Sequence, residues 1–578
     1  MANGTLPTFK LRLTTSLDDQ GKAAIEKNME DVLNHELFSS IFGQDQESDD
    51  DTDESDAREK FLCHLLVDGV AVEERLNVDF SQEPHRITGV CLHCPDTNFV
   101  NFEDAAQIQI NLDREEDDRS KIHLAKEVEA WGLALNHPSL TCIFPVALVP
   151  TCKKDHELGE STHTVAVVAK VIFEKYHSMG LHKKIGPLST ANSDGASQFR
   201  KGMGTVLSQD LPRKVRDVYK NCLLFNTVGS HWGIVIACDL DHLGKRTRER
   251  IKTALGIKVS SFTFTKADLA KYMAMSSILS DAAEAERLFN PEDAMDVCEM
   301  VKCLDVVGRL SDVPFVSFPK EWQQSMGNRA VYRELRLLGH VMRLMCTLII
   351  GHDGYASDDG EHLSVSEYLE RCSRLSFLLF FLFRRNRTKF LANQNYRNWQ
   401  DTMKNMFTTV SLGKANGVKR FYFFLNTNKR IENLFVILRS MIRGNMNFDC
   451  LDMRDRLGDS VLIQWIYSEH PEWDRSARRL TNTMDRKNTR SWRGDTLIAD
   501  VDEAKCWNDG RDWAIKVLRE SKAFSDYELD IDLIQQNEPG VDMLRPYQVQ
   551  IGVLAGDRPI YNLVDLSGEE DDEDEAAL

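Results

Sequence analysis

The spacing of apolar residues changes abruptly near residue 243, and this change limits the possible folds more than any other feature of the chain. Before that point, short apolar runs rich in valine and threonine alternate with polar segments, a spacing typical of strands. After it, apolar residues recur at helical spacing between residues 246 and 310, in 328–350, in 365–384 and again in 430–442. This order predicts an α/β core, a mixed sheet with flanking helices, interrupted by a large all-helical insertion.

Individual elements follow from the same patterns. We expect two strands within residues 61–80, joined by a turn at Asp68-Gly69, and one strand each in residues 87–94, 141–150, 162–173 and 231–240. Residues 122–135 are expected to be helical.

The chain has 578 residues, a length typical of about three to four domains. We predict an acidic, disordered leader in 1–58, with room for one helix around residues 22–37, and the first part of the core in 59–243. The helical insertion follows in 244–419, a return to the core with the Glu432 helix and C-terminal helices in 420–525, and a tail in 526–578 that is acidic and disordered at its end.

The net charge of −19 argues at first against nucleic acid as a partner. Residues 45–57 and 565–575, however, each hold 8 acidic side chains, and the rest of the chain without them carries only −3. A near-neutral body with local basic patches can bind a phosphate backbone.

Several classes of protein are disfavoured. No run of about 18 apolar residues is present, so we expect no membrane span. The start of the chain lacks the pattern of a secretory signal, and the 13 scattered cysteines suggest free thiols in a reducing compartment. Cys91 and Cys94 form one CxxC motif without a clear second ligand pair, so zinc binding and ordinary buried thiols both stay open.

Three carboxylates stand out by their context. Asp68 ends the apolar run 65–67, Asp194 precedes a glycine and a basic helical segment, and Glu432 lies beside the apolar face of a helix. Each also has an ordinary structural explanation: Asp68 as a turn aspartate, Asp194 as a helix-capping aspartate and Glu432 as a solvated glutamate. Carboxylates from distant segments can, however, hold two Mg²⁺ or Mn²⁺ ions for an in-line phosphoryl displacement.

A second candidate site follows the strand expected in 231–240. Asp239, Asp241 and His242 stand together where that strand passes into a basic helix. They can bind a metal or order a phosphate. The alternative is a helix start with acidic residues that the helix dipole favours.

The ordered motifs resemble those of the P element and THAP-domain transposases, which are relatives of the hAT group, over roughly residues 60–525. The segments that carry the resemblance are 65–75, 87–91, 193–196, 239–248, 290–297, 431–439, 470–474 and 492–495. The resemblance implies an RNase H-like core, with Asp68, Asp194 and Glu432 as catalytic metal ligands in Mg²⁺-dependent DNA strand cleavage and transfer. It also implies a nuclear protein that binds DNA and can form homo-oligomers.

Two positions depart from this family pattern. Gly69 replaces an acidic residue that often follows the first aspartate, and Asn428 stands where many relatives have an aspartate. Both changes lower the negative charge around the expected metals. The sequence therefore leaves two hypotheses, an active transposase and an inactive, domesticated DNA- or protein-binding protein of the nucleus.

Two further segments predict binding surfaces. The expected phosphate-contacting side chains are Lys245, Arg246, Arg384, Arg385, Arg387, Lys389 and Arg439. Near the end of the chain, Leu563, Val564, Asp565 and Leu566 precede an acidic run and resemble a SUMO-interacting motif, which would add a strand to the partner's sheet. The alternative is a chance apolar tetrad before a disordered tail.

Overall fold

A computed structural model gives the fold. It describes residues 11–34, 59–79, 85–94, 97–115, 120–138, 140, 142–153, 159–279, 282–289, 297–325, 327–351, 362–441, 447–470, 473 and 494–547. Both acidic segments and the predicted partner-binding residues 563–566 lie outside these ranges.

The chain folds into two compact units. Unit 1 comprises residues 1–206, 232–239 and 408–500, and unit 2 comprises residues 207–231, 240–407 and 501–578. Each unit is thus built from three separate stretches of sequence. The boundaries predicted from sequence alone stay predictions.

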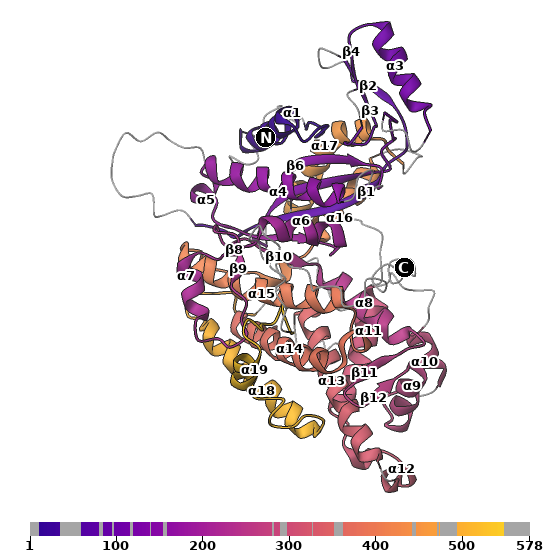
Figure 1. Ribbon diagram of the computed structural model, residues 1–578, viewed down its shortest axis with the longest axis vertical. Coiled ribbons are helices and arrows are strands. Elements are labelled where there is room, and N and C mark those ends of the chain that lie inside the picture. The colour runs from indigo at the N-terminus through magenta and orange to yellow at the C-terminus, as the bar shows by residue number, and fades with distance from the viewer. Residues whose placement is uncertain are drawn as a thin grey trace, which may run out of the picture. The chain divides into compact units, whose positions relative to one another are not determined.

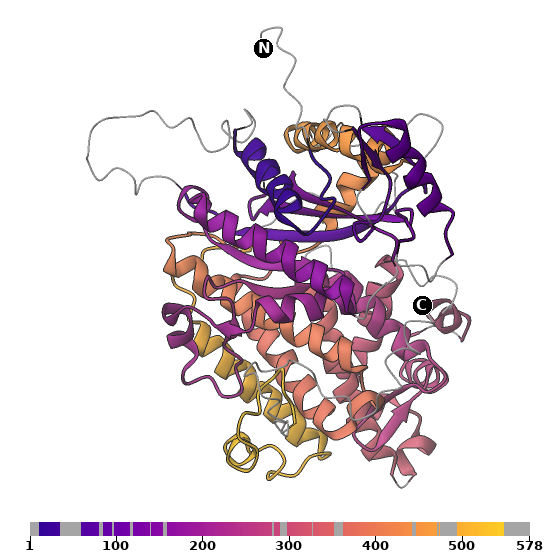
Figure 2. The same cartoon turned by 45° about the horizontal axis from the view of Figure 1, so that its top comes forward.

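The centre of unit 1 is a five-stranded sheet (Figure 1, and turned in Figure 2). Its strands are β1 (Cys63–Ala71), β5 (Glu127–Leu135), β6 (Ile143–Thr151), β7 (Leu188–Ser193) and β10 (Val235–Cys238), in the order β10-β7-β1-β5-β6. The first three strands in sequence pair antiparallel, whereas β7 and β10 run parallel to β1. This mixed sheet with its flanking helices confirms the predicted RNase H-like fold class.

Helices cover both faces of this sheet. They are α1 (Asp19–Asn34), α4 (Glu160–Ser178), α5 (Leu181–Lys184), α6 (Ser197–Val206), α16 (Lys429–Ser440) and α17 (Cys450–Glu469). On one face, Trp131 of β5 packs against Phe199 of α6, with the ring centroids 6.0 Å apart. The side chain of Asn192 in β7 points to the other face, where it reaches Asn426 just before α16.

A small three-stranded sheet is attached to unit 1 between β1 and β5. It consists of β2 (Asn77–Asp79), β3 (His85–Thr88) and β4 (Asn98–Phe99), followed by helix α3 (Phe102–Leu112). Its own core is formed by Val90, Ile108 and Ile122.

Unit 2 is mainly helical, as the predicted insertion requires, and it also contains short strand pairs. Its helices are α7 (Arg213–Arg216), α8 (Leu240–Lys252), α9 (Lys266–Met275), α10 (Ala282–Leu288), α11 (Val297–Gly308), α12 (Lys320–Gln324), α13 (Asn328–Ile350), α14 (Val365–Asn386), the first part of α15 (Asn393–Ala415), α18 (Glu503–Ser521) and α19 (Ile531–Asn537). Its strand pairs are β8 (Gln209–Asp210) with β9 (Val228–Gly229), and β11 (Ile257–Val259) with β12 (Phe262–Phe264).

The helices of unit 2 approach closely where small residues meet. A Cβ added at Gly510 of α18 would lie 2.5 Å from the Ser373 Cβ of α14, and the Ser373 hydroxyl donates to the Trp507 carbonyl at 2.6 Å. Phe225 and Phe377 pack on Trp507, with centroid distances of 4.9 and 5.1 Å. No described helix is both long and apolar enough to cross a bilayer.

Three local predictions were wrong. Strand β1 runs without a turn through Asp68 and Gly69, because both residues pair with β5 in an unbroken register. Residues 127–135 form the interior strand β5 and not a helix, since pairing with β1 and β6 on its two sides outweighs the helix propensity of alanine, leucine and glutamate.

Residues 162–173 lie in helix α4 instead of a buried strand. Their valines and threonines suggested a strand, but the buried positions of the helix follow helical spacing: Thr164, Val165, Val168, Ala169, Ile172, Phe173 and Tyr176. Tertiary burial on one side of the helix outweighs the strand preference of β-branched residues.

We predict that Trp131→Ala destabilises unit 1 by about 3–5 kcal/mol, because it empties a fully buried site between the sheet and α6. Urea unfolding followed by circular dichroism measures this loss. Phe102 is 88% exposed, so Phe102→Ala serves as the control, with an expected change within about 0.5 kcal/mol. Equal effects of the two variants would contradict the packing described for Trp131.

Candidate functional site

Three aspartates stand at equivalent positions of the three parallel strands, Asp68 within β1 and Asp194 and Asp239 directly after β7 and β10. Leu66 of β1 pairs with Asn192 of β7, which pairs in turn with Ala237 of β10. Asp68, Asp194 and Asp239 each follow two residues later, as the sequence numbering shows. Ligands of α/β sheets commonly bind at the carboxyl ends of parallel strands, and this edge is therefore the candidate site.

The segment Asn426-Thr427-Asn428, hereafter the docking triplet, attaches to all three parallel strands. The Asn426 side-chain oxygen lies 3.5 Å from the amide nitrogen of Asn192 in β7. The Thr427 hydroxyl donates to Asp239, after β10, at 3.2 Å, and the Asn428 amide donates to the Val67 carbonyl of β1 at 3.1 Å. The triplet thereby fixes the start of helix α16 against the sheet edge.

Buried polar groups hold the flanks of the docking triplet. The Asn136 side chain donates to the Tyr422 carbonyl at 2.9 Å and accepts from the Tyr422 N–H at 2.7 Å. Arg430 donates to the Leu135 carbonyl, and burial lowers the pKa of its guanidinium to about 10. The Gln464 amide of α17 accepts from the Ile143 N–H at 3.0 Å and donates to the Arg430 carbonyl at 2.9 Å.

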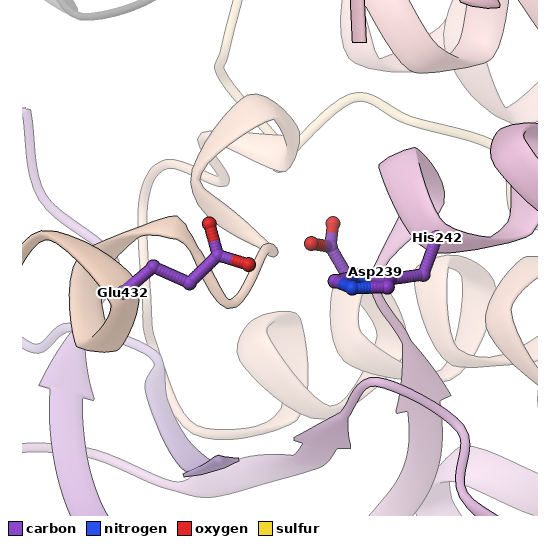
Figure 3. Close-up of side chains that lie close together, drawn as sticks. All are labelled: Asp239, His242 and Glu432. Carbon is purple, nitrogen blue, oxygen red and sulfur yellow. The ribbon is translucent and has the colours of Figure 1, made fainter. Parts of the chain in front are cut away.

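These contacts bring together Asp239, His242 and Glu432. Each offers one ligand atom within 4.8 Å of those of the other two. Figure 3 shows the Glu432 carboxylate extending from its helix toward Asp239 and His242. Asp239 directly follows β10, His242 lies one helical turn further along the chain, and Glu432 lies in the first turn of α16.

The donor set of this group suits a divalent cation. Asp239 is 1% exposed and its carboxylate is already oriented by Thr427. Two carboxylates supply oxygen ligands of the kind that Mg²⁺ and Mn²⁺ prefer, and a neutral imidazole is a common ligand of transition metals. The dipole of α16 also stabilises the negative charge of Glu432 in its first turn.

The structure thus places Glu432, from the predicted triad, beside Asp239 and His242, from the predicted second site. Within the described residues, this three-membered group contains neither Asp68 nor Asp194. Asp68 accepts from the N–H of Gly69 at 2.9 Å, and Asp194 accepts from the N–H of Ala196 at 2.9 Å, immediately before α6. Both stay predicted ligands, as does the buried Asp241.

A further carboxyl group at this edge was missed by the sequence reasoning. Glu129 of β5 pairs with Gly69 and so lies on the face opposite to Asp68. Burial raises its pKa to about 7, with contributions from the charges of Glu127 and Asp194. The prediction that residues 122–135 are helical concealed Glu129, whereas a strand assignment would have placed it in the sheet beside β1.

The Glu127 side chain of the neighbouring strand lies over Gly69. A Cβ added there would lie 2.5 Å from the carboxyl carbon of Glu127. Glu127 in turn forms an ion pair with Lys153 at 2.6 Å. The space of a side chain at position 69 is therefore occupied by a carboxylate from the neighbouring strand.

Two of the predicted DNA-contacting arginines have partners within unit 2. Arg384 forms an ion pair with Glu538 at 2.7 Å, and Arg385 forms one with Glu528 at 3.0 Å. A phosphate would have to compete with these carboxylates. DNA contacts by Lys245, Arg246, Arg387, Lys389 and Arg439 stay predictions.

The CxxC motif lies in a tight turn beside His123 and the end of β6. The Cys94 N–H donates to the Cys91 carbonyl at 3.0 Å, and the Cys94 sulfur accepts from the His123 N–H at 3.0 Å. No disulfide joins any of the described cysteines. Zinc binding at Cys91 and Cys94 stays an open prediction.

Comparison with known proteins gives one structural match. No model of a protein family matches the chain, and no curated protein matches it either. Among solved structures, the chain is similar to the Drosophila P element transposase strand transfer complex, with 14% sequence identity and a TM-score of 0.42. The match covers 73% of this chain and 79% of that chain.

We predict that Glu129→Gln stabilises the protein at pH 8 by on the order of 1 kcal/mol and has no effect at pH 4. The folded pKa of about 7 exceeds the ordinary value of 4.5, so the folded state retains this proton longer than the unfolded chain. Stability therefore falls as the pH rises from about 4.5 to about 7, and the glutamine variant escapes this loss. Urea unfolding across this range measures it.

Glu103 of α3 is exposed and provides the matched control for the glutamate substitution. Glu103→Gln should leave the pH dependence of unfolding unchanged. A Glu129→Gln variant with the same pH dependence as the wild type would contradict the environment described for Glu129.

Proposed function

We propose that the chain is a divalent-cation-dependent enzyme that cleaves and transfers DNA strands in the manner of a transposase. The observation that carries this proposal is the convergence of Asp239, His242 and Glu432 at the carboxyl ends of the parallel strands in an RNase H-like sheet. Residues 239 and 432 are far apart in sequence, and the docking triplet brings them together. Exposed acidic groups often gather by chance, but here a buried aspartate with a dedicated hydrogen-bond donor belongs to the group.

The chemistry follows from the donor set. A divalent cation bound here would supply Lewis-acid stabilisation of the charge that develops on phosphate oxygens during an in-line displacement. Asp239 and Glu432 would hold the cation and fix its position relative to the sheet edge. Thr427 orients the Asp239 carboxylate, and His242 offers a nitrogen as a third ligand or as a proton acceptor for the attacking hydroxyl.

The identity of the cation is part of the proposal. Mg²⁺ binds almost entirely through oxygen, whereas an imidazole nitrogen is better tolerated by first-row transition metals. The presence of His242 therefore favours Mn²⁺ over Mg²⁺ as the better activator. Asp68 is the proposed source of a further carboxylate ligand, since it lies on the same face as Asp239 in the aligned register.

The proposal that DNA is the substrate rests on a resemblance to transposase motifs in residues 65–75, 193–196, 239–248 and 431–439. A nuclear location, homo-oligomers and a SUMO-like partner for residues 563–566 belong to the same proposal. The second candidate function is a DNA- or protein-binding role without cleavage. The neutral residues Gly69 and Asn428 favour it, because each reduces the negative charge available to hold cations.

We predict that the purified full chain nicks supercoiled plasmid DNA in the presence of Mn²⁺, more weakly with Mg²⁺, and not with EDTA. Asp239→Asn and Glu432→Gln should each lower the nicking rate by at least about 100-fold, because each removes a cation ligand. Gel electrophoresis of the plasmid forms measures the rate, and circular dichroism checks that each variant is folded.

Glu103→Gln again serves as the control and should nick at the wild-type rate. Equal nicking by the Asp239→Asn, Glu432→Gln and Glu103→Gln variants would rule out this site as the source of activity. If the wild type binds the plasmid in a salt-dependent manner without nicking it under either cation, the non-catalytic function is the correct one.

A further inference from the structure

Two buried amide oxygens beside the candidate site have no hydrogen-bond donor. Asn192 is 0% exposed and Asn428 is 1% exposed, and the side-chain oxygen of each lacks a partner. The amide nitrogens of both are engaged, with Asn426 and with the Val67 carbonyl. A buried acceptor without a donor costs about 1–3 kcal/mol, so two at one sheet edge call for an explanation.

Asn428 lies between two of the carboxylates. It is the residue immediately before helix α16 and stands four positions before Glu432, a spacing that places both side chains on the same side of the helix. Its amide nitrogen is bound to Val67, the residue before Asp68. The Asn428 side chain is therefore next to the helix that carries Glu432 and to the strand that carries Asp68.

Asn192 lies deeper on the same face of the sheet. It pairs with Leu66 and with Ala237, each two residues before one of the aspartates, and side chains two residues apart share a face. Its contact with Asn426 places it beneath the docking triplet. The Asn192 side chain is thus next to the edge at which Asp68 and Asp239 stand.

We propose that the amide oxygens of Asn428 and Asn192 complete the coordination of the cation held by Asp239, His242 and Glu432. This inference rests on the proposed cation site and adds two neutral ligands to it. Side-chain amide oxygens are ordinary ligands of hard divalent cations, and a positive ion satisfies an acceptor that no donor reaches.

The added ligands define the class of cation. With them, four of the five protein side chains offer oxygen, which suits a six-coordinate ion such as Mn²⁺ or Mg²⁺. A structural zinc site is four-coordinate, closed and rich in sulfur and nitrogen, so this donor set disfavours Zn²⁺. The alternative is that the two oxygens accept hydrogen bonds from ordered water, in which case neither affects cation affinity.

The test measures Mn²⁺ binding to the full chain by the electron paramagnetic resonance signal of free Mn²⁺, without reference to activity. Asn428→Leu and Asn192→Val remove the oxygens, and we expect each to weaken Mn²⁺ binding by about tenfold or more. Asn28→Leu is the matched control. Asn28 of α1 is equally buried, but its amide oxygen accepts from the Arg12 N–H and its nitrogen donates to the Arg12 carbonyl, so its loss should affect stability and not cation affinity.

Asn428→Leu also removes the hydrogen bond to Val67, and Asn428→Asp separates the two effects. The aspartate loses the same bond but restores an oxygen, so it should bind Mn²⁺ at least as tightly as the wild type. If Asn428→Leu, once folded, and Asn192→Val both bind Mn²⁺ within twofold of the wild-type affinity, the two oxygens are not ligands. If Asn428→Leu does not fold, the inference is overturned by an Asn192→Val affinity within twofold of wild type, or by an Asn428→Asp affinity more than twofold weaker than wild type.

Failure of the site itself gives a different result. Wild-type protein that binds no Mn²⁺, or an Asp239→Asn variant that binds it as tightly as wild type, overturns the proposed function together with this inference. Weakening by Asp239→Asn with no effect of either asparagine overturns the inference alone.

Discussion

The attachment of residues 426–428 to the sheet is the interaction on which the candidate site depends. Each residue of this triplet reaches a different parallel strand, and each does so through a side chain that is polar and short. Hydrogen bonds buried at a sheet edge are individually modest, but a missing partner is costly, so a register shift of one residue would lose several at once. The position of Glu432 is therefore set by the triplet and not by α16 alone.

This attachment also explains how unit 1 tolerates the long stretch of chain, residues 240–407, that separates two of its segments. The entropic cost of closing a loop grows only with the logarithm of its length, so a long insertion is tolerated when its ends are held. In unit 1, the chain leaves directly after Asp239 and returns at residue 408, and the triplet follows soon after the return. Asp239 and Glu432, which converge on one cation position, therefore lie near the two ends of this inserted stretch.

The sheet edge distributes its negative charge over both faces. Asp239 and Glu432 lie on the face of α16, whereas Glu127 and Glu129 extend from β5 to the opposite face. Like charges on one face would repel each other strongly at low dielectric. On the opposite face, the raised pKa of Glu129 and the ion pair of Glu127 with Lys153 both lower the net negative charge.

The sequence was sufficient to predict that strands precede helices along the chain, that α13, α14 and α16 are helices, and that carboxylates stand at strand ends. It failed where tertiary pairing outweighs local preference: the glutamates and alanines of β5 suggested a helix, and the valines of α4 suggested a strand. Asp239 and His242 were predicted together with Asp241 as one site. Their proximity to Glu432 depends on the docking triplet, whose partners lie far away in the sequence. No local pattern of Asn426, Thr427 or Asn428 reveals those partners.

The order of synthesis gives the docking triplet one more consequence. A ribosome completes all five strands of the sheet, and with them Asp68, Asp194 and Asp239, long before it adds residue 426. Until then the cation position lacks Glu432 and the residues that orient it. A nascent or prematurely terminated chain can thus carry a nearly finished sheet and still be unable to assemble the group, so the site is withheld until most of the protein has been made.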